Sequence, residues 1–508
     1  MLKNKTTLVI LGFCIVKLTL HLIADFHSGF QGDELLHIET GNHPDFGYME
    51  FPPMIGWLAF IQNQFHSQSV FVHHIFSHLA ALLIIILVGL TTVELGGKAR
   101  AVFLVLLCIL VAPCFGRGQQ LFQPVVFSQL FWVLSFYQLV RFTKTLDQKY
   151  LLYLAISLGL GFLAKYDILF FIAGLSSLLL FKRTRDAILT KAIWKYIVLF
   201  AVLISPNIWW EYRHGFPVFN MFSRLYQMQL GHLTVAGVLI ELILALNPLT
   251  AVFWIGGLVY MFTQTNKVVY RPVAVAIVLS ILVFALNKSK AYYFFPAMIT
   301  LLMFGAVWFE QKILERRGWL IYPTAAVLAL SGIVLIPFGL AILSPEGFIT
   351  FAHIKKEDDH YHFTLDCQEY YSRGKWRNTL TALQQVYDSL PPAEQGSCLI
   401  WGKHYSQAGG VNLMGKDYGL PKAFSYHGSF YLWAPPSGKM PATVIAFTND
   451  EAGIDFFQDF FHTVVPVKRV FNRYAMFDKD LWQTIYVCKD AKGGFADLKE
   501  AFKTRIFE

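Results

Sequence analysis

The chain has 508 residues, of which 55% are hydrophobic and 15% charged, and its formal net charge is +9 at pH 7. Apolar runs of about twenty residues recur along it, which excludes an ordinary soluble domain and predicts a polytopic α-helical membrane protein. The basic residues stand mainly in short segments between these runs. The positive charge therefore indicates membrane orientation, and it gives no reason to expect nucleic acid as a partner.

The apolar runs predict about eleven transmembrane helices. In chain order the expected spans are 7–25, 70–95, 100–115, 122–141, 151–164, 166–181, 193–207, 235–262, 272–287, 291–309 and 320–343. Together they define a transmembrane domain over residues 1–345, which contains a first external loop at about 26–69. Residues 346–508 are expected to form a separate domain outside the membrane.

Lysines and arginines gather in alternate connections between these spans, which fixes the expected orientation. With the N-terminus inside, the outer side holds only Arg117, Lys165, Arg213, Arg224, Lys288 and Lys290. Because basic residues favour the cytoplasmic side, the N-terminus is predicted to be cytoplasmic in a multi-pass protein of the cytoplasmic (inner) membrane. The first loop and the C-terminal domain are then extracytoplasmic.

The first external loop is acidic and contains three histidines but no lysine or arginine in "FHSGFQGDELLHIETGNHPDFGYMEFPP". Its carboxylates, with the one that precedes it, are Asp25, Asp33, Glu34, Glu39, Asp45 and Glu50. A solvated acidic loop is one interpretation, but the many aromatic residues and prolines predict a loop that lies on the membrane surface. A divalent metal held by Asp33, Glu34 and His37 stays open, since the spacing is typical of no particular metal; no other cofactor is expected.

Five of the outer cations are candidates for binding the phosphate or pyrophosphate of a lipid-borne substrate: Lys165, Lys288, Lys290, Arg117 and Arg213. Attraction to lipid headgroups is the alternative. Cations that hold a phosphate leaving group opposite a carboxylate that accepts a proton would be a suitable arrangement for group transfer.

The C-terminal 160 or so residues read as a small α/β domain. "WRNTLTALQQVYDSL" has helical spacing, and "SCLIWG", "ATVIAF", "HTVVPVKRV" and "TIYVCKD" are typical of short strands. Cys367, Cys398 and Cys488 lie in this region, where one disulfide is a candidate.

Several stretches in this order resemble the GT-C class of membrane glycosyltransferases, in the branch that includes protein O-mannosyltransferases and the aminoarabinose transferases of lipid A. They are "GDELLHIETG", "GYMEFPPMIGWLA", "FSQLFWVL", "GLGFLAKYDILFF", "SPNIWWEYRHGFP", "NPLTAVFWIGGL" and "NKSKAYYFFPAMITLL", with "WGKHYSQAGGVNLMGKDYGLPKAFSYHGSFYLWAPP" in the C-terminal region. The resemblance implies transfer of a sugar from a polyprenyl-phosphate donor, on the outer face of the membrane, to an acceptor hydroxyl or phosphate of a lipid, a glycan or a protein.

The resemblance also implies roles for single residues. An acidic residue of the first loop is the general base, which corresponds to Asp33 with Glu34 beside it, and Lys165, Lys288 and Lys290 correspond to the donor-phosphate site. Displacement in one step with inversion is expected, and a covalent carboxylate intermediate is the alternative.

Two positions depart from the pattern of the relatives. Ser128 stands where many of them have Asp, and Glu50-Phe51 stands where some have a lysine before two prolines. If that lysine binds phosphate in the relatives, Glu50 cannot replace it, and the donor contacts of this protein differ from theirs.

Candidate sugar-contacting residues are polar or aromatic neighbours of these groups, although Trp and Tyr also collect at membrane interfaces. They are His37, Tyr48, Glu50, Trp209, Trp210, Tyr292 and Tyr293.

A transporter or flippase of lipid-linked sugars is the rival interpretation, because it also needs outward cations and aromatic side chains. Such proteins place ionisable residues along several spans and show symmetry between their halves. Few such residues are evident in the spans, with Glu241 as one example, so the sequence favours an enzyme. The expected partners are the lipid-linked donor, the acceptor and membrane lipids. The identities of the sugar and the acceptor, and the oligomeric state, stay open.

Overall fold

The computed structural model describes residues 2–264, 267–363, 367–449 and 453–507. The chain forms two compact units. The first comprises 1–23, 51–54 and 74–340, and the second comprises 24–50, 55–73 and 341–508. Most of the first external loop, apart from residues 51–54, is thus grouped with the C-terminal region, whereas the sequence assigned the loop to the transmembrane domain.

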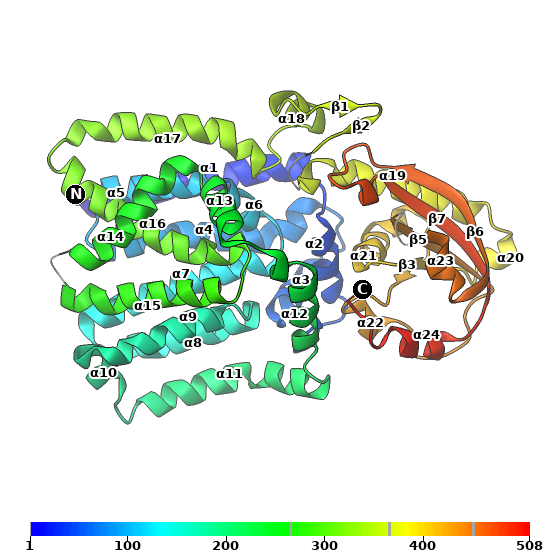
Figure 1. Ribbon diagram of the computed structural model, residues 1–508, viewed down its shortest axis with the longest axis horizontal. Helices are drawn as coiled ribbons and strands as arrows, with labels where there is room; N and C mark the ends of the chain where they lie inside the picture. The colour runs from blue at the N-terminus through cyan, green and yellow to red at the C-terminus, as the bar shows by residue number, and fades with distance from the viewer. Residues whose placement is uncertain (1, 265–266, 364–366, 450–452, 508) are drawn as a thin grey trace. The chain divides into compact units, whose positions relative to one another are not determined.

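The first unit is made of helices, most of which run roughly side by side (Figure 1). They are α1 (Leu2–His27), α4 (Val70–Glu94), α5 (Ala99–Leu110), α6 (Pro113–Gln120), α7 (Pro124–Thr145), α8 (Gln148–Ala164), α9 (Ile168–Leu175), α10 (Lys182–Ile188), α11 (Ile193–Arg213), α12 (Pro217–Met228), α13 (Val235–Ala245), α14 (Ala251–Thr263), α15 (Lys267–Leu286), α16 (Phe295–Phe309) and α17 (Ile321–Leu335).

Seven helices in the described ranges are long and apolar enough to cross a membrane, and up to nine are counted if each of two bent pairs is one span. Three shorter apolar helices, Gln148–Ala164, Ile168–Leu180 and Pro248–Thr263, occupy places where the sequence predicted spans or parts of them. A polytopic helical membrane protein is therefore confirmed, and the expected count of about eleven includes these shorter helices.

The expected span 235–262 is wrong as a single helix. It is divided into α13 and α14, because Asn247 adopts a φ of 65° and Pro248 follows it. Proline lacks an N–H and disfavours helical backbone in the residue before it. The side chain of Asn247 stabilises the break by donating a hydrogen bond to Ser331 Oγ at 2.8 Å and accepting one from the N–H of Leu249.

Close helix packing in this unit depends on two glycines. A Cβ on Gly305 of α16 would lie 1.8 Å from the carbonyl oxygen of Phe253, and a Cβ on Gly257 of α14 would lie 2.1 Å from that of Leu301. Small residues allow helix backbones to approach in this way in membrane proteins. α14 and α16 therefore touch backbone to backbone.

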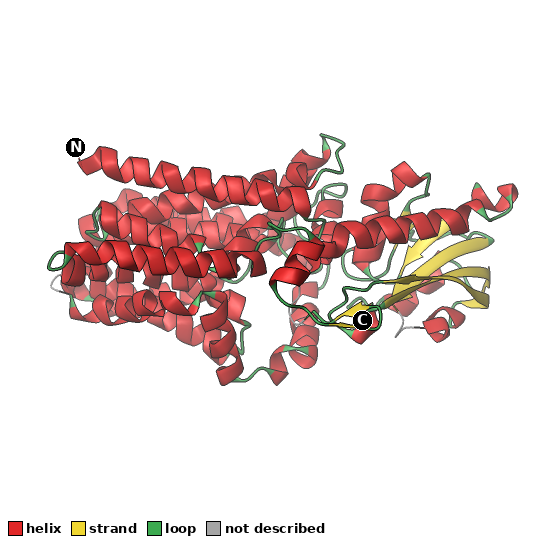
Figure 2. Ribbon diagram, turned by 90° about the horizontal axis from the view of Figure 1, so that it is seen from above, coloured by secondary structure: helices red, strands yellow, loops and turns green. Residues whose placement is uncertain are grey.

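The second unit contains a five-stranded mixed sheet and the helices that surround it (Figure 2). Its helices are α2 (Gly32–Thr40), α3 (Met54–Asn63), α18 (Pro345–Phe351), α19 (Gln368–Asp388), α20 (Pro392–Gln395), α21 (Tyr405–Met414), α22 (Phe430–Trp433), α23 (Gly453–Gln458) and α24 (Phe495–Phe502). Its strands are β1 (Lys356–Glu357), β2 (His360–Tyr361), β3 (Leu399–Gly402), β4 (Ala423–Phe424), β5 (Thr443–Asn449), β6 (Phe461–Phe471) and β7 (Trp482–Ala491).

The strand order of the large sheet is β4-β3-β5-β7-β6. Strands β4, β3 and β5 are parallel, whereas β7 is antiparallel to both β5 and β6. The helix and the four strands predicted from the quoted segments are confirmed as α19, β3, β5, β6 and β7. The core on one face of this sheet is aromatic and surrounds Trp401, which is 1% exposed.

The candidate disulfide is wrong. All six cysteines are free thiols in the structure, and the three in the second unit are buried. Cys488 lies inside β7, where it packs in the core around Trp401 as a small apolar residue.

Candidate active site

Helix α2 carries Asp33, Glu34 and Glu39 of the first loop and packs on α21 in the second unit. Its N-terminus forms a capping box, in which the Gln31 side chain accepts from the Asp33 N–H and the Glu34 carboxylate accepts from the Gln31 N–H at 2.8 Å. A Cβ on Gly409 of α21 would lie 2.7 Å from the carbonyl oxygen of Leu35, so only glycine permits this close approach. The register of α2 is thereby fixed.

Asp33 is held by a tyrosine from the C-terminal region. The Tyr405 hydroxyl donates to Asp33 Oδ1 at 2.6 Å. The Asp33 side chain is partly exposed, and no lysine, arginine or histidine of the described ranges forms an ion pair with it. One carboxylate oxygen is thus oriented, and the carboxylate keeps capacity to accept a further proton or hydrogen bond.

The other acidic side chains of the loop serve local structure. Glu34 is fully buried beneath its cap contact. Glu39 accepts from Asn412 Nδ2 at 3.0 Å and from Asn42 Nδ2 at 2.8 Å, while Asp45 accepts from the N–H of Phe46. Among these carboxylates, Asp33 combines partial exposure with a fixed orientation.

The rings of two histidines lie against Tyr405. The ring centroids of His404 and His427 lie 4.0 Å and 4.8 Å from that of Tyr405. Desolvation, together with the positive charge of Lys403, holds the pKa of His427 well below its ordinary value. The His427 imidazole is therefore neutral at pH 7, and it places no positive charge beside Asp33.

Glu50 is bound by Ser429, which donates to its carboxylate from both the backbone N–H and Oγ. The turn that presents Ser429 needs Gly428, whose φ is 59°. Burial, with a contribution from the negative charge of Asp33, raises the pKa of Glu50 to about 7, against the hydrogen bonds from Ser429 that favour the charged form. Near neutral pH, Glu50 therefore takes up a proton more readily than an ordinary glutamate does.

This raised pKa predicts a pH-dependent stability. The folded protein binds a proton on Glu50 below pH 7 that the unfolded chain releases above its ordinary pKa of 4.5. The stabilisation is complete below pH 4.5 and is lost as the pH rises through 7. We expect Glu50→Gln to reduce the decline of the thermal unfolding midpoint between pH 5 and pH 8. The exposed Glu500→Gln is the control, and equal declines in wild type and Glu50→Gln would contradict the assignment.

In the first unit, Lys165 forms a compact charged site at the end of α8. Its Nζ lies 2.7 Å from Asp167 Oδ2 and 4.0 Å from the centroid of the Tyr293 ring. Ser128 donates from Oγ to Asp167 Oδ1 at 2.8 Å. Ser128 thus acts as a hydrogen-bond donor that positions Asp167.

The short turn that contains Lys288 and Lys290 leads directly to the same place. Lys288 donates to the carbonyl of Gly231 at 3.1 Å and Lys290 to the side chain of Gln229. Tyr292 follows Lys290, and its ring centroid lies 4.9 Å from Lys165 Nζ. The structure therefore connects the Lys288–Lys290 turn with Lys165 through two stacked tyrosines, Tyr292 and Tyr293.

The remaining predicted residues are placed as follows. Arg213 lies over the ring of Trp209, with 5.4 Å to the centroid, and Trp209 is 58% exposed. Trp210 is buried and stacks on His214. Arg117 is in α6.

In the loop, His37 is buried in α2. Tyr48 is 1% exposed, and its hydroxyl donates to the carbonyls of Thr40 and His43. Tyr48 therefore stabilises the loop, in a position that is closed to solvent.

The sequence did not single out Asp167, Tyr405 or Glu211. Asp167 pairs with Lys165, and Tyr405 holds Asp33. Glu211 is 2% exposed and accepts from the Tyr166 hydroxyl at 3.0 Å. A carboxylate between apolar neighbours, as in "KYDILFF" and "IWWEYR", was the available signal for Asp167 and Glu211.

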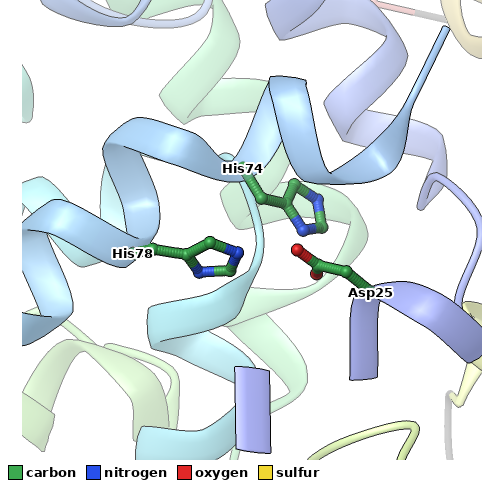
Figure 3. A group of neighbouring side chains, drawn as sticks. All are labelled: Asp25, His74 and His78. Atoms are coloured by element: carbon green, nitrogen blue, oxygen red, sulfur yellow. The ribbon is translucent and has the colours of Figure 1, made fainter. Parts of the chain in front are cut away.

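Asp25 on α1 and His74 and His78 on α4 could hold a metal ion (Figure 3). All three are buried, and their potential ligand atoms lie within 4.8 Å of one another. Two imidazoles and one carboxylate suit a divalent transition metal such as zinc better than magnesium. The set proposed from the sequence, Asp33, Glu34 and His37, is not this group.

The chain is similar in sequence and in structure to known membrane glycosyltransferases. Residues 50–210 match the sequence profile of a family described as dolichyl-phosphate-mannose-protein mannosyltransferase. The lipid A galacturonosyltransferase RgtD of Rhizobium johnstonii is 25% identical over 215 residues, which cover 41% of this chain and 43% of that protein. The match thus spans less than half of the relative's length.

Two crystal structures of ArnT from Cupriavidus metallidurans share the fold over nearly the whole chain. The structure bound to undecaprenyl phosphate has a TM-score of 0.55 at 13% identity, and the apo structure has 0.58 at 12%. They cover 95% and 94% of this chain, and 97% of the ArnT chain in both cases. Together with the family profile and the relative, they support the class of GT-C membrane glycosyltransferases, as the sequence predicted.

Proposed function

We propose that this protein is a glycosyltransferase that moves a sugar from a polyprenyl-phosphate donor to an acceptor in the outer leaflet or beyond it. The observation that carries the proposal is the partly exposed Asp33 carboxylate, oriented by Tyr405 and free of a cationic partner in the described ranges. A carboxylate in this state can accept the proton of an attacking hydroxyl.

The donor phosphate is assigned to the cations of the first unit. Lys165, Lys288 and Lys290 supply charge-assisted donors, with Arg117 and Arg213 as further candidates, and Tyr292 and Tyr293 provide an aromatic surface beside Lys165. Cations stabilise the negative charge that develops on a departing lipid phosphate. The ArnT structure with undecaprenyl phosphate supports a polyprenyl phosphate of that kind as the carrier.

The acceptor is a lipid in this proposal, since the curated relative is named a lipid A galacturonosyltransferase. The orientation follows from the distribution of Lys and Arg, which puts the N-terminus in the cytoplasm of a bacterial inner membrane and the second unit outside it. Asp33 then acts as the base in a single displacement, which inverts the configuration at the sugar.

The experiment uses purified full-length protein in liposomes with undecaprenyl-phosphate-linked hexose and pentose donors and an envelope glycolipid fraction. We expect mass spectrometry to detect glycosylated lipid together with free undecaprenyl phosphate. Donor that crosses the bilayer intact, without release of the lipid phosphate, would establish the rival flippase function. In right-side-out vesicles the product must form from acceptor added outside, and product that requires acceptor inside would reverse the orientation.

A further inference from the structure

A cavity of about 530 Å³ lies within the second unit, beside α19 and the ends of three strands. Asn449 at the end of β5 and Phe471 at the end of β6 contribute to its lining, as does Gln483 at the start of β7. Open α/β sheets bind ligands outside the carboxyl ends of their parallel strands, and β5 is one of these. The volume is typical of a small-molecule site.

The cavity has an excess of positive charge. Four cations line it, Arg373, Lys375, Arg377 and Arg473, against two carboxylates, Glu346 and Asp480. Asp480 already accepts a hydrogen bond from Asn449. None of the three arginines forms an ion pair with an acidic side chain in the described part of the chain. Their charge is therefore available to an anion.

Arg373 is held in place by the backbone of the loop. Its Nη2 donates to the carbonyl oxygens of Asp25 and Ser28 at 3.1 and 2.7 Å. The planar guanidinium of arginine matches the oxygens of phosphate and carboxylate groups. Arg373, Arg377 and Arg473 are all exposed, and together they offer several donors to one ligand.

Aromatic and amide side chains complete the lining. Tyr474 lines the cavity and stacks on Tyr371, with 5.7 Å between ring centroids, and on Tyr361 at the same distance. Asn378 and Asn472 are also in the wall. Flat rings pack against sugar faces and amides bond to hydroxyls, so this lining favours a carbohydrate over a simple anion.

We propose that this cavity binds a carbohydrate that carries phosphate or carboxylate groups, and that it holds the anionic glycan part of the acceptor. The role of this glycan as part of the acceptor rests on the proposed glycosyltransferase function, whereas the binding of an anionic saccharide does not. Neither Asp33 nor Tyr405 lines the cavity, so the two sites are separate within the second unit.

The test measures binding by calorimetry with the full-length protein in detergent, without any donor. The probes are tetragalacturonate, which is anionic, and maltotetraose, which is neutral. We expect tetragalacturonate to bind and maltotetraose to bind at least about tenfold more weakly. The double variant Arg377→Gln/Arg473→Gln should weaken tetragalacturonate binding at least about tenfold, which is about 1.4 kcal/mol. Lys416→Gln, at an exposed position of the same unit outside the cavity, should bind like wild type.

Three results would overturn the proposal: equal binding of both saccharides, unchanged binding by the double variant, or no binding of tetragalacturonate. Competition arms identify the source of the anion. Inorganic phosphate should compete weakly, and vesicles of phosphatidylglycerol should not displace the saccharide; displacement by the vesicles would indicate a lipid-surface site in its place.

Failure of the proposed function is separable from failure of this proposal. If the protein binds tetragalacturonate through Arg377 and Arg473 but transfers no sugar, the glycan-binding proposal stands and the proposed glycosyltransferase function fails. If the protein transfers sugar but its Arg377→Gln/Arg473→Gln variant binds tetragalacturonate like wild type, the proposed function stands and the cavity is not the glycan-binding site.

Discussion

Replacing Asp33 with asparagine should leave a folded protein that binds donor normally but transfers sugar about a hundredfold to ten-thousandfold more slowly. Asparagine keeps the size of the side chain and an oxygen that accepts from the Tyr405 hydroxyl, so the contact between α2 and α21 is preserved. What is lost is basicity. Steady-state transfer rates and equilibrium binding of undecaprenyl phosphate, measured on the same preparation, separate the two effects.

Glu34→Gln is the matched control, since Glu34 is the adjacent carboxylate. It is buried, and its carboxylate accepts from the Gln31 N–H, which glutamine can also do. We expect a smaller loss of rate than for Asp33→Asn. If Glu34→Gln caused the larger loss in a correctly folded protein, the base would have to be reassigned to Glu34.

Removing the charge of Lys165 should have the second large effect. Lys165→Met keeps an unbranched side chain of nearly the same length but removes the charged hydrogen-bond donor. Hydrogen bonds to charged groups contribute about 1.5–3 kcal/mol, so binding of undecaprenyl phosphate should weaken about tenfold to a hundredfold. Turnover should fall as well, because the charge on the leaving group loses a stabilising cation.

The pairing of Lys165 with Asp167 requires a compensated variant. Lys165→Met alone leaves the Asp167 carboxylate, which is 6% exposed, with a hydrogen bond from Ser128 but without its neighbouring positive charge. The double variant Lys165→Met/Asp167→Asn removes both charges and preserves the hydrogen bond with Ser128. If this double variant bound undecaprenyl phosphate as tightly as wild type, the phosphate site would lie elsewhere, with Arg117 and Arg213 as the next candidates.

Local pattern was sufficient to predict much of the fold. Long apolar runs became helices, and alternating apolar segments such as "ATVIAF" became strands of the sheet. The hydropathy signal is continuous across Asn247 and Pro248 and therefore predicted one span, whereas the Asn-Pro pair was the local signal for the break. Three apolar helices are shorter than a typical membrane span, so hydropathy alone does not separate them from full transmembrane helices.

The contacts within the candidate site could not be predicted from local sequence pattern. The resemblance identified Asp33, but its partner Tyr405 is 372 positions away, and no spacing rule connects them. The grouping of the first loop with the C-terminal region likewise depends on tertiary contacts, such as Gly409 against Leu35. Asp167 differs, because its place two residues from Lys165 in an apolar segment was visible in the sequence.

The most direct test of the central claim is a single-turnover experiment in which the donor is bound before the acceptor is added. Release of undecaprenyl phosphate is then followed for wild type and for Asp33→Asn at equal donor occupancy. Our account predicts equal occupancy and a release rate at least about a hundredfold lower in the variant. Equal release rates in the two proteins would contradict Asp33 as the general base.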